Sequence, residues 1–130
     1  MRSLAFACLL LVGCADSDPP AMRTLVTAIA TQEGSAAADA TERLVPYGRR
    51  GLVVLEAALH TAAPPGRRRL VRAIRRLGDE DGAALLGHVA RWDEAAEVRT
   101  EAKGALEAWA ADRSLPTRAA TAARVLAVVN

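Results

Sequence analysis

The sequence predicts an all-α fold, arranged as a short α-solenoid of paired helices, and two observations support this prediction. Alanine accounts for 30 of the 130 residues and aromatic residues for only 3%, a composition that favours helix over strand. Apolar residues recur at helical spacing between turn signals, and the resulting helices fall into pairs with a period of about 30 residues. An irregular helical bundle is the alternative architecture.

Turn signals bound each of the first three predicted helices. The first, residues 21–30, follows two prolines, and its apolar residues share one face: Met22, Leu25, Val26 and Ile29. The second, residues 36–45, stops at a Pro-Tyr-Gly turn at residues 46–48. The third, residues 49–61, directs Leu52, Leu55 and Leu59 inward, and a Pro-Pro-Gly sequence at residues 64–66 then breaks the chain.

Four more helices follow the same pattern. The fourth, residues 67–77, buries one apolar face and ends at an acidic turn at residues 78–81. The fifth, residues 82–91, directs inward Leu85, Leu86 and Val89. Residues 93–96 lead into a sixth helix that ends near residue 111. The last predicted helix covers residues 117–129. The segment Ser114-Leu115-Pro116 indicates its start, because proline is favoured at the beginning of a helix.

The predicted helices repeat as pairs. A shift of about 30 residues lays Val54-Leu55 over Ala84-Leu85, and a shift of about 29 lays a Leu-x-x-Ala segment at residue 70 over Arg99-x-x-Ala102. The segment at residues 98–106, Val-Arg-x-x-Ala-x-x-Ala-Leu, resembles the second-helix signature of HEAT-like repeats, and Leu77-Gly78-Asp79 resembles their inter-repeat turn.

The resemblance to HEAT-like repeats covers about residues 36–128 and implies stacked helical pairs whose second helices line a concave binding surface. The sequence departs from the family pattern in three places. Two prolines at residues 64–65 stand where an Asp-rich turn is usual, the turn at residues 93–97 is longer than normal, and the last helix lacks a clear partner.

The N-terminal segment resembles the signal peptide of a bacterial lipoprotein precursor. Arg2 supplies a positive charge, residues 4–12 supply about nine apolar residues, and Leu11-Val12-Gly13-Cys14 resembles the lipobox. The apolar run is too short for a bilayer span, which needs about 20 residues. The resemblance implies that residues 1–13 are removed, that Cys14 is lipidated, that residues 14–20 are the lipidated cysteine and a short linker, and that residues 21–130 form the repeat domain.

Two other interpretations of this segment are an ordinary signal-peptidase site, which would release a chain beginning at Asp16, and a buried first helix. The lipoprotein interpretation places the protein in the bacterial cell envelope, attached to the membrane through its lipid. The linker from Ala15 reaches only about 20 Å, so the domain is expected close to the membrane surface. Alanine rather than aspartate directly after Cys14 favours the outer membrane, facing the periplasm.

No catalytic, metal-binding or cofactor-binding motif is recognisable, and we predict that the protein is not an enzyme. His60 and His88 lie on different predicted helices without a third ligand nearby. Glu97 and Glu101 are one turn apart but are flanked by basic residues, as on a solvated face. The net charge of +2 and the scarcity of aromatic rings argue against a nucleic-acid partner. Trp92 and Trp109 are predicted to fill the core or a gap between repeats.

Arginine placement is the one feature that suggests a binding face. Six arginines fall within residues 67–76 without an acidic residue among them, and four form one helical stripe: Arg68, Arg72, Arg75 and Arg76. Guanidinium groups bind carboxylates and phosphates, so an acidic protein segment or an anionic headgroup would fit. The alternative is a solvated face neutralised by residues 79–81 and by Glu94, Glu97 and Glu101.

The sequence therefore predicts a lipid-anchored, non-catalytic module that binds another protein. The alternative is a structural or accessory subunit packed permanently into an envelope complex. A charged groove would favour the first function, and exposed apolar residues around Leu115 and residues 125–129 would favour the second. The partner's identity and the oligomeric state stay open.

Overall fold

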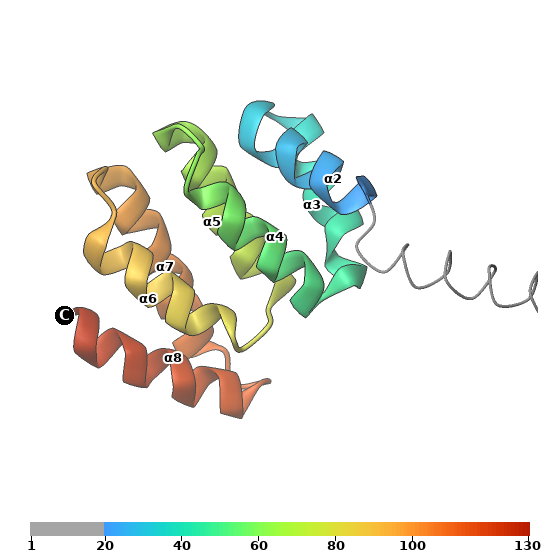
Figure 1. Cartoon of the computed structure of the whole chain (residues 1–130). Helices are drawn as coiled ribbons and strands as arrows, with labels where there is room; N and C mark the ends of the chain where they lie inside the picture. Colours follow the sequence, from blue (N-terminus) through green and yellow to red (C-terminus); the bar gives the residue numbers. More distant parts are fainter. Residues whose placement is uncertain (1–19) are drawn as a thin grey trace, which may run out of the picture.

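The computed structural model describes residues 20–130, which form seven α-helices and one short 3-10 helix without any strand (Figure 1). The predicted all-α class is confirmed. The predicted signal peptide and Cys14 lie outside the described residues. The elements are α2 (Pro20–Thr31), α3 (Ser35–Leu44), η1 (Val45–Tyr47), α4 (Arg49–Leu59), α5 (Pro64–Leu77), α6 (Gly82–Trp92), α7 (Ala96–Ala111) and α8 (Pro116–Val129).

None of the described helices combines the length and the apolar character needed to cross a bilayer.

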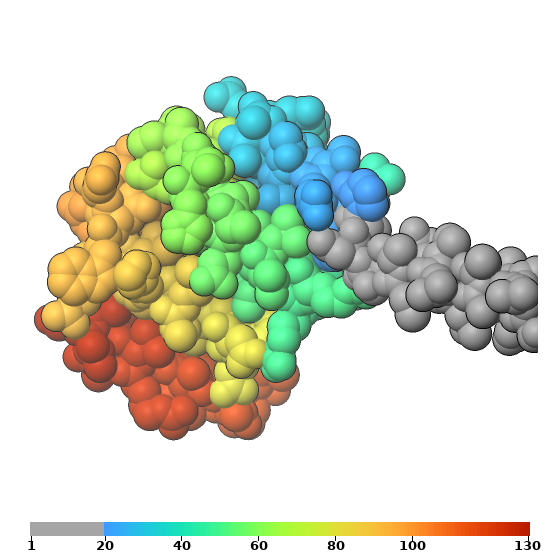
Figure 2. Space-filling model, in the orientation of Figure 1, coloured from blue at the N-terminus to red at the C-terminus, as the bar shows by residue number. Residues whose placement is uncertain are grey.

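Neighbouring helices pack against each other in chain order. Helix α2 packs on α3, α4 on α5, and α6 on α7, while α5 also packs on α7 and α8 lies against both α6 and α7. In Figure 1, α2, α4 and α6 face the viewer and α3, α5 and α7 lie behind them. In the space-filling view of Figure 2, the surfaces of α2, α4, α6 and α8 follow one another across this side of the molecule.

The core is built from aliphatic side chains of every helix, and no polar side chain is buried within residues 20–130. Each fully buried aliphatic side chain contributes about 1.5–3 kcal/mol relative to an exposed one. Small residues between them let the helices approach closely. At Gly66 a Cβ atom would collide with the carbonyl oxygen of Ala30, and at Gly87 it would collide with the side chain of Val125. These two glycines bring α5 against α2 and α6 against α8.

Helix α5 begins three residues earlier than the sequence suggested. The prolines at 64 and 65, which were expected to lie in a break, occupy the first turn of the helix, where the missing N–H group has no intrahelical partner to lose. The helix ends at Gly78, whose φ of 73° is left-handed and whose N–H group donates to the carbonyl of Ile74.

The buried positions show a longer repeat than the sequence shifts suggested. Leu55 of α4 corresponds in burial to Leu86 of α6, 31 residues later, whereas the residue at the predicted shift, Leu85, is only half-buried. Leu70 of α5 corresponds to Ala102 of α7, 32 residues later. The shifts of about 30 and 29 residues were therefore short by one to three positions.

Candidate functional site

Three of the four stripe arginines form ion pairs with acidic residues of the neighbouring helices. Arg72 contacts Glu101 of α7 at 2.9 Å, and Arg68 contacts the same carboxylate at 3.4 Å. Arg76 donates two hydrogen bonds to Glu42 of α3, at 2.7 and 2.9 Å. The pairing with Glu101 was anticipated from the sequence as part of the solvated-face alternative, and the pairing with Glu42 was not.

Arg75 differs from its three neighbours. Its side chain is exposed, and no ion pair to it is found within residues 20–130. Its backbone carbonyl accepts a hydrogen bond from the indole Nε1 of Trp109 at 3.3 Å. The stripe therefore presents less unbalanced charge than its sequence indicates. Because the side chains of Arg72 and Arg76 are more than half exposed, solvent weakens their pairs and leaves them open to competition.

The two remaining arginines of the cluster have structural roles. Arg69 donates to the carbonyls of Ile29 and Ala30, both at 2.8 Å, and so satisfies the C-terminal end of α2. Arg67 makes a bidentate pair with Asp93, which follows α6, and donates to the carbonyl of Ala62 at 2.9 Å. Neither guanidinium is available to a ligand while these bonds persist.

The Asp93 carboxylate is held in its ionised form. Its burial raises the pKa, but the hydrogen bonds from Arg67 and from the backbone N–H of Ala95 outweigh this effect, so the pKa of Asp93 lies below its ordinary value. The Asp93 carbonyl also accepts a hydrogen bond from Arg99 at 2.6 Å. Asp93 thus fixes the turn between α6 and α7.

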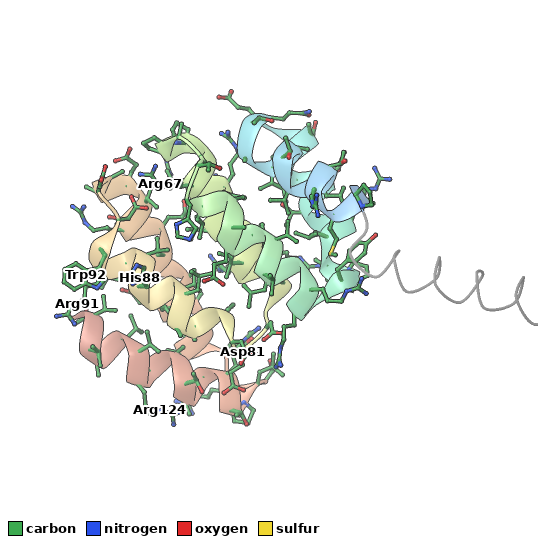
Figure 3. The ribbon with its side chains drawn as sticks, in the orientation of Figure 1. Arg67, Asp81, His88, Arg91, Trp92 and Arg124 are labelled. Atoms are coloured by element: carbon green, nitrogen blue, oxygen red, sulfur yellow. The ribbon has the colours of Figure 1, made fainter. Side chains whose placement is uncertain are left out.

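A groove of about 570 Å³ lies between α4 and α6, on the side away from the arginine stripe. Both apolar and polar side chains line it. Figure 3 shows His88 on α6 and Trp92 at the end of that helix. The residues that line the groove are Glu56, Leu59 and His60 from α4, Ala84, Leu85, His88, Val89 and Trp92 from α6, and Asp81 and Asp93 from the flanking turns.

The groove brings together His60 and His88, which occupy non-equivalent positions of the sequence repeat. The two imidazoles alone do not make a metal site, and no group of three or more potential ligands is found in the described part of the chain. We find no nucleophile–base pair in the groove either, since Glu56, Asp81 and the two histidines are its polar side chains apart from the paired Asp93.

A second hollow of about 370 Å³ lies on the other side of α6, between α6 and α8. It is more apolar than the groove, and two arginines are among the residues that line it, Arg91 on α6 and Arg124 on α8 (labelled in Figure 3). The other residues that line it are Ala84, Gly87, His88 and Trp92 from α6, and Thr121, Val125, Val128 and Val129 from α8.

Trp92 lines both hollows and is 65% exposed. The prediction that it fills the core or a gap between repeats was wrong, whereas the same prediction for Trp109, which is 3% exposed, is confirmed. Trp92 shares a helical stripe with Leu85 and Val89, so its position looks inward by periodicity. The groove beside α4 leaves the Trp92 end of this stripe uncovered, and the guanidinium of Arg91, 5.1 Å from the ring centre, lies over the indole.

The exposed large apolar side chains concentrate on one layer of helices. Val53 on α4, Trp92 on α6 and Val128 on α8 are each at least 60% exposed. The remaining one within residues 20–130, Leu115, is 49% exposed and lies next to the start of α8. We call the surface formed by α4, α6 and α8, with its two hollows, the α4–α6–α8 face. An exposed apolar surface of this kind is typical of a protein interface.

No protein-family model, curated protein or solved structure matches this chain.

Proposed function

We propose that the protein is a non-catalytic protein-binding module of the bacterial cell envelope, attached to the membrane by a lipid on Cys14. The observation that best supports the binding of a protein, whether exchangeable or permanent, is the open, apolar α4–α6–α8 face with Trp92 between two hollows. The partner therefore docks on this face. The arginine stripe becomes a secondary candidate, because three of its four members already hold carboxylates.

The proposal includes a HEAT-like architecture for residues 21–130. Its support is the correspondence of buried positions between successive pairs. Leu55 and Leu86 share a place in α4 and α6, and Ile74 and Leu106 share a place in α5 and α7. In stacked repeats each pair contacts only its neighbours, and the terminal helix has a face without a following pair. Helix α8 follows the pair formed by α6 and α7, and it contributes Val128 to the exposed apolar surface.

A second candidate function is a permanently packed accessory subunit of an envelope complex. The exposure of Leu115 before the start of α8 and of Val128 near its end favours it, because a permanent partner would cover these apolar side chains. The two functions differ in whether the bound partner can dissociate. A module releases its partner on dilution, whereas an obligate subunit stays bound during purification in mild detergent.

A photo-crosslinking experiment in intact cells tests the proposed function. A photoreactive amino acid replaces Trp92 in the full-length chain, and in a matched control it replaces Glu107, an exposed residue of α7 outside the face. We expect a discrete crosslinked polypeptide from position 92 and none from position 107. Equal crosslinking at both positions, or none at position 92, would contradict the proposal.

The lipid anchor is tested separately in the same cells. Cells fed an alkyne-tagged fatty acid should label the wild-type chain and fail to label a Cys14→Ala variant, which should also leave the membrane fraction. Labelling that survives the substitution would rule out Cys14 as the anchor without affecting the binding proposal.

A further inference from the structure

We propose that the polypeptide that docks on the α4–α6–α8 face is a second copy of this chain, in a two-fold symmetric dimer. The inference rests on the proposed function, since it names the partner of the same face. Two properties of the face support it: the alternation of ridges and hollows, and the opposite charges of Glu56 on α4 and of Arg91 and Arg124 beside the second hollow.

The shape of the face is self-complementary. Helix α6 forms a central ridge with a hollow of about 570 Å³ toward α4 and another of about 370 Å³ toward α8. A two-fold axis parallel to α6 turns a second copy so that its α6 ridge enters the first hollow and its α4 ridge enters the second. The same operation fills the hollows of both copies, as an isologous interface requires.

The opposite charges of Glu56 and of the two arginines are complementary under the same rotation. Glu56, exposed on α4, has no ion pair within residues 20–130. Arg124, exposed on α8, donates only to the hydroxyl of Thr121, at 3.1 Å, among the bonds found in residues 20–130. When the α4 ridge of one copy enters the α6–α8 hollow of the other, Glu56 approaches Arg91 and Arg124. Symmetry makes this contact twice.

The apolar side chains find partners in the same arrangement. Val53 lies one helical turn before Glu56 on α4, so it enters the same hollow about one turn nearer the starts of α6 and α8, beside Ala84 and Thr121 of the second copy. Trp92 lies at the end of each α6 ridge and is covered by the α4–α6 groove of the other copy. A two-fold interface requires that one surface carry both members of each ion pair, as this face does with an acid on α4 and bases on α6 and α8. An unrelated partner could bind a face of a single charge.

Charge exchange in the full-length chain tests the dimer. A photoreactive amino acid at Val53 should yield, in cells and in the detergent-purified protein, a product of twice the chain mass that contains only this sequence. Glu56→Arg should reduce its yield about tenfold, and Arg91→Glu/Arg124→Glu should do the same. The variant that carries all three substitutions should recover the yield. A matched control, Glu107→Arg, should leave it unchanged.

The outcomes separate this inference from the proposed function. A yield that is insensitive to the reversals, or that the combined variant fails to restore, overturns the dimer. Crosslinking of positions 53 and 92 to a different envelope protein overturns the dimer and leaves the proposed function standing. Absence of any crosslinked polypeptide at both positions overturns both. Because Glu56, Arg91 and Arg124 are exposed, unchanged far-UV circular dichroism should show that the variants still fold.

Discussion

Arg67 and Asp93, 26 residues apart in sequence, form a bidentate pair in which the Nε–Oδ2 and Nη2–Oδ1 distances are both 2.9 Å. The pair joins the first turns of α5 to the turn that follows α6, and both side chains are largely shielded from water. It therefore fixes the end of α6, where Trp92 stands exposed. An arginine that the sequence places in a basic cluster serves here as a structural clamp beside the candidate binding face.

Loss of this clamp should destabilise the fold. Asp93→Ala leaves the Arg67 guanidinium shielded from water without its carboxylate, and we expect a loss of about 2–4 kcal/mol in the free energy of unfolding. Urea denaturation followed by far-UV circular dichroism measures it. Asp39→Ala, at an exposed acidic residue of α3, is the control and should change stability by less than about 0.5 kcal/mol. Equal losses in the two variants would show that Asp93 has no special role.

The contribution of Asp93 should depend on pH in a defined direction. Its pKa in the folded protein is lowered from the ordinary value of 3.8, so the folded state favours the ionised form. The stabilisation is complete above about pH 5 and is lost as the pH falls through the lower, folded-state pKa. The stability difference between wild type and Asp93→Asn should accordingly be constant from pH 7 to about pH 5 and shrink below pH 4. A difference that grows on acidification would contradict this sign.

Two helical glycines should respond in opposite directions to the same substitution. Gly87→Ala drives a methyl group into Val125 where α6 meets α8, and we expect a loss of about 1–3 kcal/mol. Gly104→Ala on α7 meets nothing within 4 Å, so it should stabilise the helix by up to about 1 kcal/mol. Thermal unfolding of the two variants measures both effects. If both changed stability equally, α8 would not pack on α6 as described.

The two tryptophans should differ sharply in their structural importance. Trp109→Ala removes a buried ring that donates to the Arg75 carbonyl, and it should cost about 3–5 kcal/mol. Trp92→Ala removes an exposed ring and should cost less than about 1 kcal/mol. Iodide quenching of fluorescence offers an independent check, because the Trp109→Ala variant retains the accessible indole and the Trp92→Ala variant retains the shielded one. Similar quenching in the two would contradict the assigned exposures.

Local sequence signals were sufficient to predict the helices, because apolar spacing and turn residues act within a few positions. The start of α5 was missed by three residues because Pro64 suits the first turn of a helix as well as a break. The exposure of Trp92 could not be predicted in this way. Its inward-looking position is set by periodicity, whereas its exposure depends on how closely α4 approaches α6.

The arginine cluster shows the same limit at the level of the candidate site. The spacing of the arginines correctly separates the stripe from the residues that pack inward. Which carboxylate each arginine pairs with depends on the tertiary packing of the helices. The Arg76–Glu42 pair spans 34 residues and forms because α3 and α5 pack together. The groove that joins His60 and His88 likewise depends on the packing of helices that the sequence treats separately. One sequence feature could have indicated the apolar face: few charged residues occupy the outer positions of α8, where Ala120, Ala127 and Val128 are exposed.

The most direct test of the central claim, that the α4–α6–α8 face binds protein, is crosslinking capture from intact cells with two matched variants of the full-length chain. One carries Val53→Asp/Val128→Asp on the face, and the other carries Arg72→Glu/Arg75→Glu/Arg76→Glu on the stripe, with unchanged far-UV circular dichroism required of both. We predict that the polypeptide captured by the wild type is lost from the face variant and retained by the stripe variant. Loss from the stripe variant alone would contradict the claim and identify the arginine stripe as the binding face.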